Sequence, residues 1–396
     1  MAAKSKAAII AAARSAIGTA RKGSLANMEP IEVAKPIVAA AVERSGLDAT
    51  DFEDLILAES LQGGGDSARY IAVDLGFESI PGAAVNRQCA SSLAAISFGA
   101  GQIASGMSRH LLAGGMESLS TMPQFLKRKA FTTGKEADDW GRWAPMSNPI
   151  TIADAPPFDM SITVAHNCAV EYGLTREDQD AWALRSHQRA VKAVDAGSFV
   201  DEIVPIQVPQ QDGSTITFAE DEHPRRDTSM ESLAGLKVLH PEIEGFSVTA
   251  GNSSGTNDAA AVVALAAPDT QQPVLASILS WAQVGVAPKR TGSGPIYAIP
   301  KALDLAGLKI SDVALFEINE AFAAQVIPSA KHLGISWDKL NTRGGGIALG
   351  HPFGMTGARI MGTLIHNLQE SDKQFGMESM CVGGGQGMSM IIERLS

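Results

Sequence analysis

The chain of 396 residues is long enough for two domains, or for one large domain with an insertion. Its 45% hydrophobic and 19% charged residues exclude a disordered chain, and its net charge of −11 argues against nucleic acid as the main partner. Three cysteines cannot form a disulfide framework, and no uncharged apolar run approaches the roughly 18 residues of a membrane span. We therefore expect a cytoplasmic α/β enzyme that has no membrane partner.

The first residues of the chain contain no acid before Glu29 and are rich in Ala, Ser, Lys and Arg. Mitochondrial presequences have the same bias. A buried first strand at 8–12 followed by a polar loop explains the same residues without cleavage, and we prefer this interpretation.

Helical patterns then alternate with short β-prone runs, which is typical of a layered α/β protein. Periodicity predicts a helix over 30–46 and a second helix, rich in small residues, over 91–105. The predicted strands of this part are 55–57, 83–86 and 110–114, the last of them ending at a glycine pair.

The character of the sequence changes between 119 and 246, where prolines, tryptophans and charges become frequent, as in 134–149. A long helix is predicted here over 175–196, because Thr175 and Asp178 form a capping-box pattern. We interpret the whole stretch as an inserted loop domain that covers a site.

A short pattern occurs twice, from Gly46 to Asp51 and from Gly307 to Asp312. Each copy follows a helical segment and precedes a β-prone run, the second of which is Leu315–Ile318. The repeat predicts two similar halves with a site at their junction. One half would comprise 1–118 and 247–270, and the other 271–396.

Cys89 lies at a predicted turn from a strand into a helix. The free N–H groups and the positive end of the helix favour a thiolate, so we expect the pKa of this thiol to fall below about 8.5. The alternative is a buried, inert cysteine, which is the commoner fate of a single thiol.

His351 lies in the glycine-rich run 344–357, where the backbone must approach another group closely. It could serve as the base for a thiol, or be a loop histidine bonded to the backbone. Cys381 precedes a second glycine-rich run, which is difficult to explain by packing, whereas Cys168 on a helical stretch is predicted to be core. A zinc site is disfavoured because no Cys-x-x-Cys spacing occurs, and no metal is expected.

Asn319 follows the second β-prone run, and an amide there could hold a water or orient a carbonyl. Its neighbour Glu320 could be a base or the charge of a helix end. The run 251–255 lacks the lysine of a P-loop, and no glycine motif of a dinucleotide site opens a helix.

Eight segments, in this order and spacing, resemble the thiolase family over nearly the whole chain. They are 11–18, 86–93, 114–118, 176–190, 248–258, 319–322, 346–359 and 381–387. The resemblance implies an α/β fold with a five-layered α/β/α/β/α core of two similar halves, an inserted loop domain, and a homodimer or homotetramer.

The resemblance also implies a reaction. Cys89 would attack a 3-ketoacyl-CoA and keep the acyl group as a thioester, with His351 as its base, close to the thioester oxygen of the substrate. Cys381 would move the proton at the α-carbon of acetyl-CoA. Asn319, through a water, would complete one oxyanion hole, and the N–H groups of Cys89 and Gly383 the other.

By the same resemblance, CoA is a substrate and no cofactor is bound permanently. Arg225 and Ser232 would lie at its adenosine-phosphate end and Ser254 near its pantetheine. The complete set of implied CoA-binding residues is Arg225, Ser232, Ala250, Ser254 and Phe322. A solvated arginine pair at 225–226 is the alternative for the first of these.

Several residues depart from the acetoacetyl-CoA-forming members of the family. The run 88–92 is closer to the degradative members, Met160–Ile162 stands in place of His-Met-Gly, and His166 replaces a glutamate. Met355–Thr356, beside His351, is also unusual. The expected activity is therefore that of a degradative 3-ketoacyl-CoA thiolase (acetyl-CoA C-acyltransferase) of fatty acid β-oxidation.

Three alternatives remain. A biosynthetic acetoacetyl-CoA thiolase would use the same residues in the opposite direction. A ketoacyl synthase would need two histidines instead of a histidine and Cys381. A catalytically silent acyl-CoA-binding protein would lack at least one of Cys89, His351 and Cys381, and all three are present.

Overall fold

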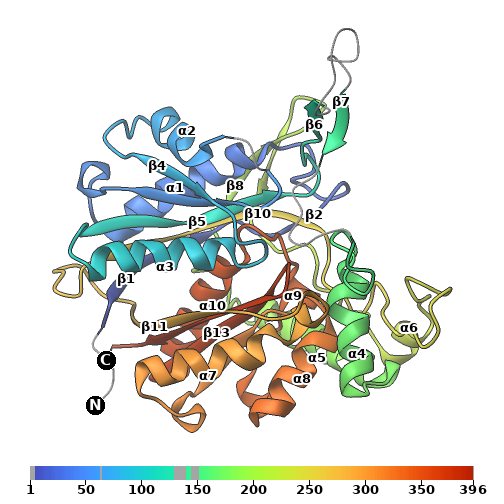
Figure 1. Cartoon of the computed structure of the whole chain (residues 1–396). Coiled ribbons are helices and arrows are strands. Elements are labelled where there is room, and N and C mark those ends of the chain that lie inside the picture. The colour runs from blue at the N-terminus through green and yellow to red at the C-terminus, as the bar shows by residue number, and fades with distance from the viewer. Residues whose placement is uncertain (1–4, 63–64, 129–139, 144–150, 396) are drawn as a thin grey trace.

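The computed structural model describes residues 5–62, 65–128, 140–143 and 151–395. Figure 1 shows two stacked β-sheets, with helices between them and on their outer faces. The site described below depends on how these layers bring distant segments together.

The upper sheet of Figure 1 belongs to the first half of the chain. Its main strands, in pairing order, are β1 (Ala7–Arg14), β10 (Asn257–Ala266), β5 (His110–Ser118), β3 (Leu55–Glu59) and β4 (Gly82–Val85), and the short β2 (Gly18–Thr19) also pairs with β10. β3 is parallel to β4 and β5, whereas β10 is antiparallel to β5 and β1. The strands predicted at 8–12, 55–57 and 83–86 are confirmed.

The prediction that a strand ends at Gly114 is wrong, because β5 continues through Gly115 to Ser118. A Cβ on Gly114 would lie 2.1 Å from the carbonyl oxygen of Ala261 in β10. A Cβ on Gly115 would lie 2.2 Å from the carbonyl oxygen of Gly354. These glycines therefore permit close approach of other backbone segments, and they do not form a turn.

The lower sheet belongs to the second half. Its strands, in pairing order, are β12 (Leu315–Ile318), β13 (Phe375–Val382), β14 (Gln386–Glu393) and β11 (Ala276–Gly285). Helices α7 (Gly294–Ala306) and α8 (Ala323–Leu333) lie on its outer side. β11 also pairs with the start of β1, so one path of hydrogen bonds joins the two sheets.

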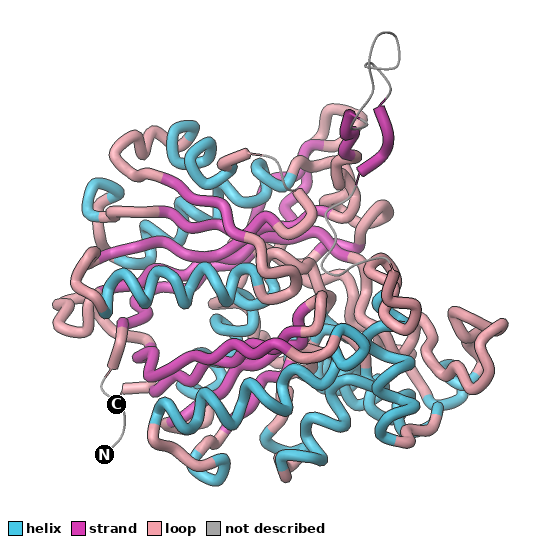
Figure 2. Tube along the Cα trace, in the orientation of Figure 1, coloured by secondary structure: helices cyan, strands magenta, loops and turns pink. Residues whose placement is uncertain are grey.

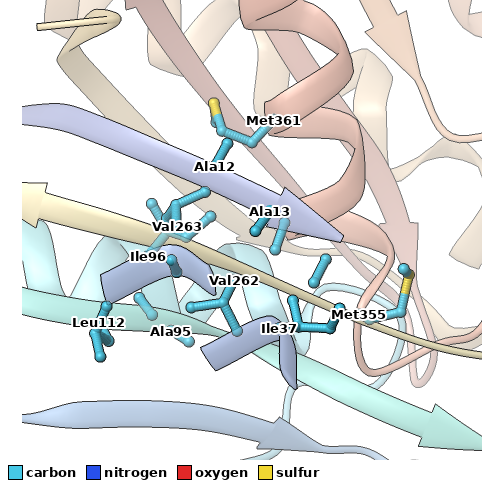
Figure 3. Packing of buried hydrophobic residues seen from close by; sticks show 14 of the residues in the cluster. Ala12, Ala13, Ile37, Ala95, Ile96, Leu112, Val262, Val263, Met355 and Met361 are labelled. Carbon is cyan, nitrogen blue, oxygen red and sulfur yellow. The ribbon is translucent and has the colours of Figure 1, made fainter. Parts of the chain in front are cut away.

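Helices α3 (Ser91–Ala104) and α10 (Thr356–Glu370) form the middle layer, while α1 (Pro30–Ser45) and α2 (Ser67–Asp74) cover the other side of the first sheet. Figure 3 shows Ile37 of α1, Val262 of β10, Ile96 of α3 and Met361 of α10 in one buried cluster. The layer order α/β/α/β/α expected from the sequence is thereby confirmed.

The predicted repeat is confirmed at the level of the backbone. α1 ends at Gly46 with φ 69°, and α7 ends at Gly307 with φ 66°. Each glycine adopts the left-handed conformation that a side chain would disfavour, and each is followed by a 3₁₀ turn, Ala49–Asp51 or Ile310–Asp312, and then by a strand. In the same way, α3 of one half corresponds to α10 of the other.

Between β5 and β10 the chain forms smaller elements that cover one end of the layers. They are the hairpins β6 (Phe125–Arg128) with β7 (Trp140–Trp143) and β8 (Ile206–Pro209) with β9 (Thr215–Phe218), a π-helical turn Ser161–His166, and helices α4 (Asn167–Tyr172), α5 (Arg176–Asp195) and α6 (Met230–Ala234).

The long helix predicted in this region is α5. Thr175 accepts a hydrogen bond from the N–H of Asp178, and the Asp178 carboxylate accepts one from the N–H of Thr175, so the capping box is confirmed. Much of the predicted proline- and tryptophan-bearing run at 134–149 lies outside the described residues. The domain boundaries at 119 and 246 stay a prediction.

Every helix in the described part of the chain is too short or too polar to span a membrane.

Candidate active site at the junction of the two halves

Cys89 lies in the turn between β4 and α3, as the sequence predicts. Its neighbour Gln88 has a φ of 50°, an uncommon conformation for a residue with a side chain. The hydroxyl of Ser60 donates a hydrogen bond of 2.7 Å to the carbonyl of Gln88, and Asn86 donates one of 2.8 Å to the carbonyl of Ser60. The turn that presents the sulfur is thus held by the segment that follows β3.

The predicted low pKa of Cys89 is wrong. Burial raises the pKa of the Cys89 thiol to about 11, and the hydrogen bond from the N–H of Gly383 opposes this shift only in part. The charge of nearby Glu117 raises the pKa further. The cost of burying a charged thiolate therefore outweighs the stabilisation that N–H donors near the start of α3 give it, and the thiol needs a separate base.

His351 occupies the loop between α9 (Gly346–Leu349) and α10, and its side chain is buried. The hydroxyl of Thr356 donates a hydrogen bond of 2.8 Å to the carbonyl of Pro352, so it accepts the hydrogen bond of 2.7 Å that joins it to Nδ1 of His351. This arrangement places the proton of the neutral ring on Nδ1 and the lone pair on Nε2, which accepts a hydrogen bond of 3.3 Å from the side-chain amide of Asn319.

Burial and the positive charge of Arg359 lower the pKa of His351 to about 3. The imidazole is therefore neutral at physiological pH, which is the state that a general base requires.

Asn319 directly follows β12 and is buried beside His351. Its amide nitrogen lies 3.3 Å from Nε2 of His351, and its backbone N–H donates a hydrogen bond to the carbonyl of Ser379 in β13. Among the described residues its amide oxygen has no hydrogen-bond partner. This oxygen is free to accept a hydrogen bond from water or substrate.

Cys381 lies near the end of β13 and is buried. Burial raises the pKa of its thiol, and the proximity of Cys89 raises it further, which places the two sulfurs in one electrostatic environment. Apolar side chains of Val164, Ala321, Met160 and Phe322 pack with Cys381. Cys168, in α4, is buried among apolar residues, as predicted for core.

The segments that carry these residues meet where α10 packs on α3. The N–H of Ala358 donates a hydrogen bond of 3.0 Å to the hydroxyl of Ser92, and a Cβ on Gly357 would lie 2.6 Å from the backbone nitrogen of Leu93. Two groups of residues therefore lie at this junction. In the first, Cys89 interacts with Gly383 and Cys381. In the second, His351 contacts Asn319.

Glu320 is neither a free base nor a helix-end charge. It is buried, and its carboxylate accepts hydrogen bonds from Trp182 at 3.0 Å and Asn341 at 2.8 Å, from the N–H of Ile347 at 3.3 Å, and from the hydroxyl of Ser186. Each oxygen of the Glu320 carboxylate therefore accepts two hydrogen bonds. Glu320 therefore ties α5 to the segment that leads to His351.

The implied CoA-binding residues fall into two places. Ser254 donates its N–H to the carbonyl of Ala321, and Ser253 forms a β-bridge with Phe322, so Ser254 and Phe322 adjoin the segment of Asn319. Ala250 is exposed in the same loop.

Arg225 and Ser232 are exposed and lie apart from this segment. The hydroxyl of Ser232 closes the capping box at the start of α6. Arg225, Arg226 and Lys192 line a pocket of about 320 Å³ beside α5. Arg226 forms an ion pair of 2.7 Å with Asp195, and both arginines are exposed, so the solvated pair stays an alternative.

His166, the departure noted in the sequence, stacks on Phe246 with ring centroids 4.9 Å apart. Phe246 also contacts His240, which bonds to Asp159 and Glu242 at 2.8 Å each. The hydrogen bonds with Glu242 and Asp159 raise the pKa of His240. The segment around Met160 is thus fixed by an aromatic and ionic cluster.

Sequence reasoning missed three supporting residues. Thr356 orients His351, Asn257 accepts the N–H of His351 at 3.1 Å, and Glu117 accepts the N–H of Gly354 at 2.8 Å. Each lies within one of the eight segments that resemble the thiolase family, but no role was assigned to it. The sequence signal for these residues is a polar side chain inside a run of small or apolar residues.

Two models of one protein family together match most of the chain. The thiolase N-terminal domain model matches residues 7–269, and the thiolase C-terminal domain model matches residues 272–394. An acetyl-CoA acetyltransferase of Escherichia coli is 40% identical over 395 residues, with 98% of this chain and 99% of the relative covered. A 3-ketoacyl-CoA thiolase of Bacillus subtilis is 37% identical over 407 residues, with the same coverage of 98% and 99%.

A solved structure supports the same assignment. The crystal structure of the Bacillus anthracis acetyl-CoA acetyltransferase has a TM-score of 0.90 and 38% identity, and the match covers 100% of both chains.

Proposed function

This chain belongs to the thiolase family, whose members are acyltransferases that use CoA thioesters, and we propose that it cleaves a 3-ketoacyl-CoA with CoA. The products would be acetyl-CoA and an acyl-CoA that is shorter by two carbons. The observation that carries the proposal is the position of the lone pair on Nε2 of the buried, neutral His351, at the junction that also holds the sulfurs of Cys89 and Cys381.

The first half-reaction breaks a carbon–carbon bond. Nε2 of His351 takes the proton of the Cys89 thiol, and the thiolate attacks the 3-keto carbon. The bond to the α-carbon then breaks, and the acetyl-CoA enolate that leaves takes the proton of the Cys381 thiol. The acyl group remains on Cys89 as a thioester.

The second half-reaction returns the enzyme to its starting state. The Cys381 thiolate takes the proton of the CoA thiol, and the CoA sulfur attacks the thioester carbonyl. Cys89 leaves as a thiolate and recovers its proton from His351. All protons and electron pairs are thereby accounted for, and no redox partner is needed.

Fixed donors would stabilise the oxyanions that form in both steps. The N–H of Gly383 already donates to the sulfur of Cys89, so it is close to the carbon under attack. We assign it, with the N–H of Cys89, to the thioester oxyanion. Asn319, through a water, would serve the enolate oxygen together with His351. Loss of one such donor in other enzymes costs about 10²–10³ in rate.

The proposal includes CoA contacts at Arg225, Ser232, Ala250, Ser254 and Phe322. The pocket lined by Arg225, Arg226 and Lys192 also contains Asp195, the partner of Arg226, and the excess of positive charge that remains on an acidic protein favours a phosphate-bearing ligand end. Ser254 and Phe322 adjoin Asn319 and would contact the pantetheine arm.

An acyl group larger than acetyl is favoured by the residues around Cys381. Met160 and Val164 present apolar surface beside this sulfur, against which an aliphatic acyl chain could pack. A role in fatty acid β-oxidation, a cytoplasmic location, and a homodimer or homotetramer belong to the same proposal. The Escherichia coli and Bacillus subtilis relatives carry the names of different activities, so acetoacetyl-CoA formation from two acetyl-CoA is the second candidate.

The test compares substrates and cysteine variants of the full chain. Cleavage of acetoacetyl-CoA and of 3-ketoacyl-CoAs of six or more carbons is followed by release of acetyl-CoA. The proposal expects the longer substrates to give the higher kcat/KM, and a preference for acetoacetyl-CoA supports the second candidate.

Cys89→Ala should form no acyl-enzyme by intact mass. Cys168→Ala is the matched control, because it removes a buried thiol outside the reaction and should keep activity. An acyl adduct on the Cys89→Ala protein is incompatible with the proposal.

A further inference from the structure

Glu117 is a buried carboxylate near the end of β5 that the reaction above does not use. It accepts three hydrogen bonds. One oxygen accepts the N–H of Gly354 at 2.8 Å, and the other accepts the amide of Gln62 at 2.8 Å and the N–H of Leu61 at 3.2 Å. One side chain therefore binds two loops that are far apart in the sequence.

The first of these loops carries the base. Gly354 is three residues after His351, and a Cβ on Gly354 would lie 2.3 Å from the carbonyl oxygen of Met116. The loop therefore lies directly against β5, where the carboxylate of Glu117 can set its position.

The second loop supports the nucleophile. Leu61 and Gln62 directly follow Ser60, whose hydroxyl donates to the carbonyl of Gln88 and whose carbonyl accepts from Asn86. Gln88 precedes Cys89 in the turn with positive φ. A shift of Leu61 and Gln62 would therefore be transmitted to Cys89 through Ser60.

We propose that Glu117 is a positioning residue for acyl transfer, which holds the His351 loop and the Cys89 turn at a fixed separation. The inference rests on the proposed function, because this separation matters only if His351 takes the proton of Cys89. Proton transfer needs donor and acceptor within hydrogen-bond reach, and a displacement of about 1 Å can lower a rate about 10²-fold.

The charge state of Glu117 gives the proposal a pH signature. Burial, with a smaller contribution from Asp258 on β10, raises the pKa of Glu117 to about 7. All three groups that bond to it are donors, so a proton on the carboxyl must displace one of them. Asp258 and Cys89 are the titratable groups that act on Glu117 electrostatically.

The pKa values of about 11 for Cys89 and about 3 for His351 lie outside the range from pH 6 to 8. Activity should therefore rise with pH through about 7 as Glu117 loses its proton.

The test uses the full chain with Glu117→Gln, which keeps the shape and removes the charge. We expect kcat to fall about 10²-fold while KM for CoA stays within a factor of about three. The inflection of the pH profile near 7 should disappear. Alkylation of Cys89 by iodoacetamide should slow and should also lose its inflection near pH 7.

Glu59→Gln is the matched control. Glu59 is also buried, but its carboxylate accepts hydrogen bonds from Ser67 at the start of α2, and none of them comes from Gln62, Leu61 or Gly354. This variant should keep the wild-type kcat and pH profile. Thermal unfolding of each variant reports its folding, and Glu117→Asp, which keeps the charge, should retain an inflection at a reduced rate.

Two results would overturn the proposal. One is a Glu117→Gln enzyme with wild-type kcat and an unchanged inflection. The other, which needs no variant, is wild-type alkylation of Cys89 that shows no inflection between pH 6 and 8. If the wild type cleaves no 3-ketoacyl-CoA, the proposed function fails separately, and the alkylation rates still test the role of Glu117.

Discussion

The hydroxyl of Thr356 lies 2.7 Å from Nδ1 of His351, and it has already donated its own proton to the carbonyl of Pro352. The ring must therefore donate to the hydroxyl from Nδ1. This one hydrogen bond decides which nitrogen of His351 keeps a lone pair, and so which nitrogen can serve as the base.

Thr356→Val should lower kcat about 10- to 100-fold, because a buried N–H loses its acceptor and the ring is free to change its tautomer or rotate. Thr356→Ser should restore most of the rate, since it retains the hydroxyl. Steady-state cleavage assays measure both, and ¹⁵N NMR of the imidazole identifies the protonated nitrogen. Equal rates for the valine variant and wild type would show that the hydroxyl does not orient the base.

Cys381→Ala should separate the two half-reactions. Transfer of an acyl group from acyl-CoA to Cys89 also loses the proton that Cys381 gives to the leaving CoA sulfur, but a thiolate is a far weaker base than a carbon enolate, so this transfer should fall much less. Cleavage of a 3-ketoacyl-CoA should fall about 10²–10⁴-fold, because the leaving enolate has lost its proton donor. Intact mass measures the acyl-enzyme, and acetyl-CoA release measures cleavage. Equal loss of both activities would contradict the assigned role.

Gly350 is the residue before His351, has a φ of 105°, and leaves no room for a side chain. A Cβ there would lie 2.7 Å from the side chain of Asn257, which accepts the N–H of His351. Gly350→Ala should therefore reduce kcat by at least about 10²-fold by moving the base.

Gly334→Ala is the matched control for Gly350→Ala. Gly334 also has a positive φ, 66°, but has no atom within 4 Å of its Cβ position. This variant should cost about 1–2 kcal/mol of stability and leave kcat unchanged. The comparison fails if the two variants lose activity to the same extent.

The lowered pKa of His351 also predicts a dependence of stability on pH. In the unfolded chain a histidine titrates near 6.5, whereas the pKa of folded His351 is about 3. Between these values the unfolded state binds a proton that the native state does not, so acid favours unfolding. Relative to His351→Asn, the wild type should lose about 1.4 kcal/mol of unfolding free energy per pH unit as the pH falls below 6.5.

The difference between the two proteins is the quantity to measure, by urea denaturation at pH 6.5, 5.5 and 4.5. Burial raises the pKa of Glu117 to about 7 and of Glu317 to about 8, and these carboxyls act in the opposite sense in both proteins. A difference that stays constant over this range would contradict the assignment of a buried neutral imidazole.

Local signals in the sequence predicted local structure well. The glycine turns at Gly46 and Gly307 and the Thr175 cap depend on backbone preferences within a few residues, and all three are found. The convergence of Cys89 and His351 could not be obtained from such signals. It was expected only from the resemblance of eight ordered segments, because the two residues lie on different halves of the chain.

Features that depend on distant contacts were missed or mistaken. The pKa of Cys89 is governed by the protein that surrounds its sulfur, including Gly383 in the other half, and not by the start of α3 alone. The strand from 110 was predicted to end at Gly114 and Gly115, although this pair lies inside β5 and admits backbone from β10 and from Gly354. The sequence also left Glu320 open as a base. Its four hydrogen-bond donors come from α5 and from 341–347, which are distant in the sequence, so a local pattern could not show that its carboxylate is already bonded.

The correspondence of α3 and α10 has a further consequence. α3 begins after Cys89 and α10 after His351, and the first turns of the two helices pack on each other. Under the proposed function neither half carries both the nucleophile and its base, so catalysis requires the two halves to be docked. Two fragments of the chain, cut between the halves, should each be inactive alone. Co-expression of the two fragments should restore activity by fragment complementation.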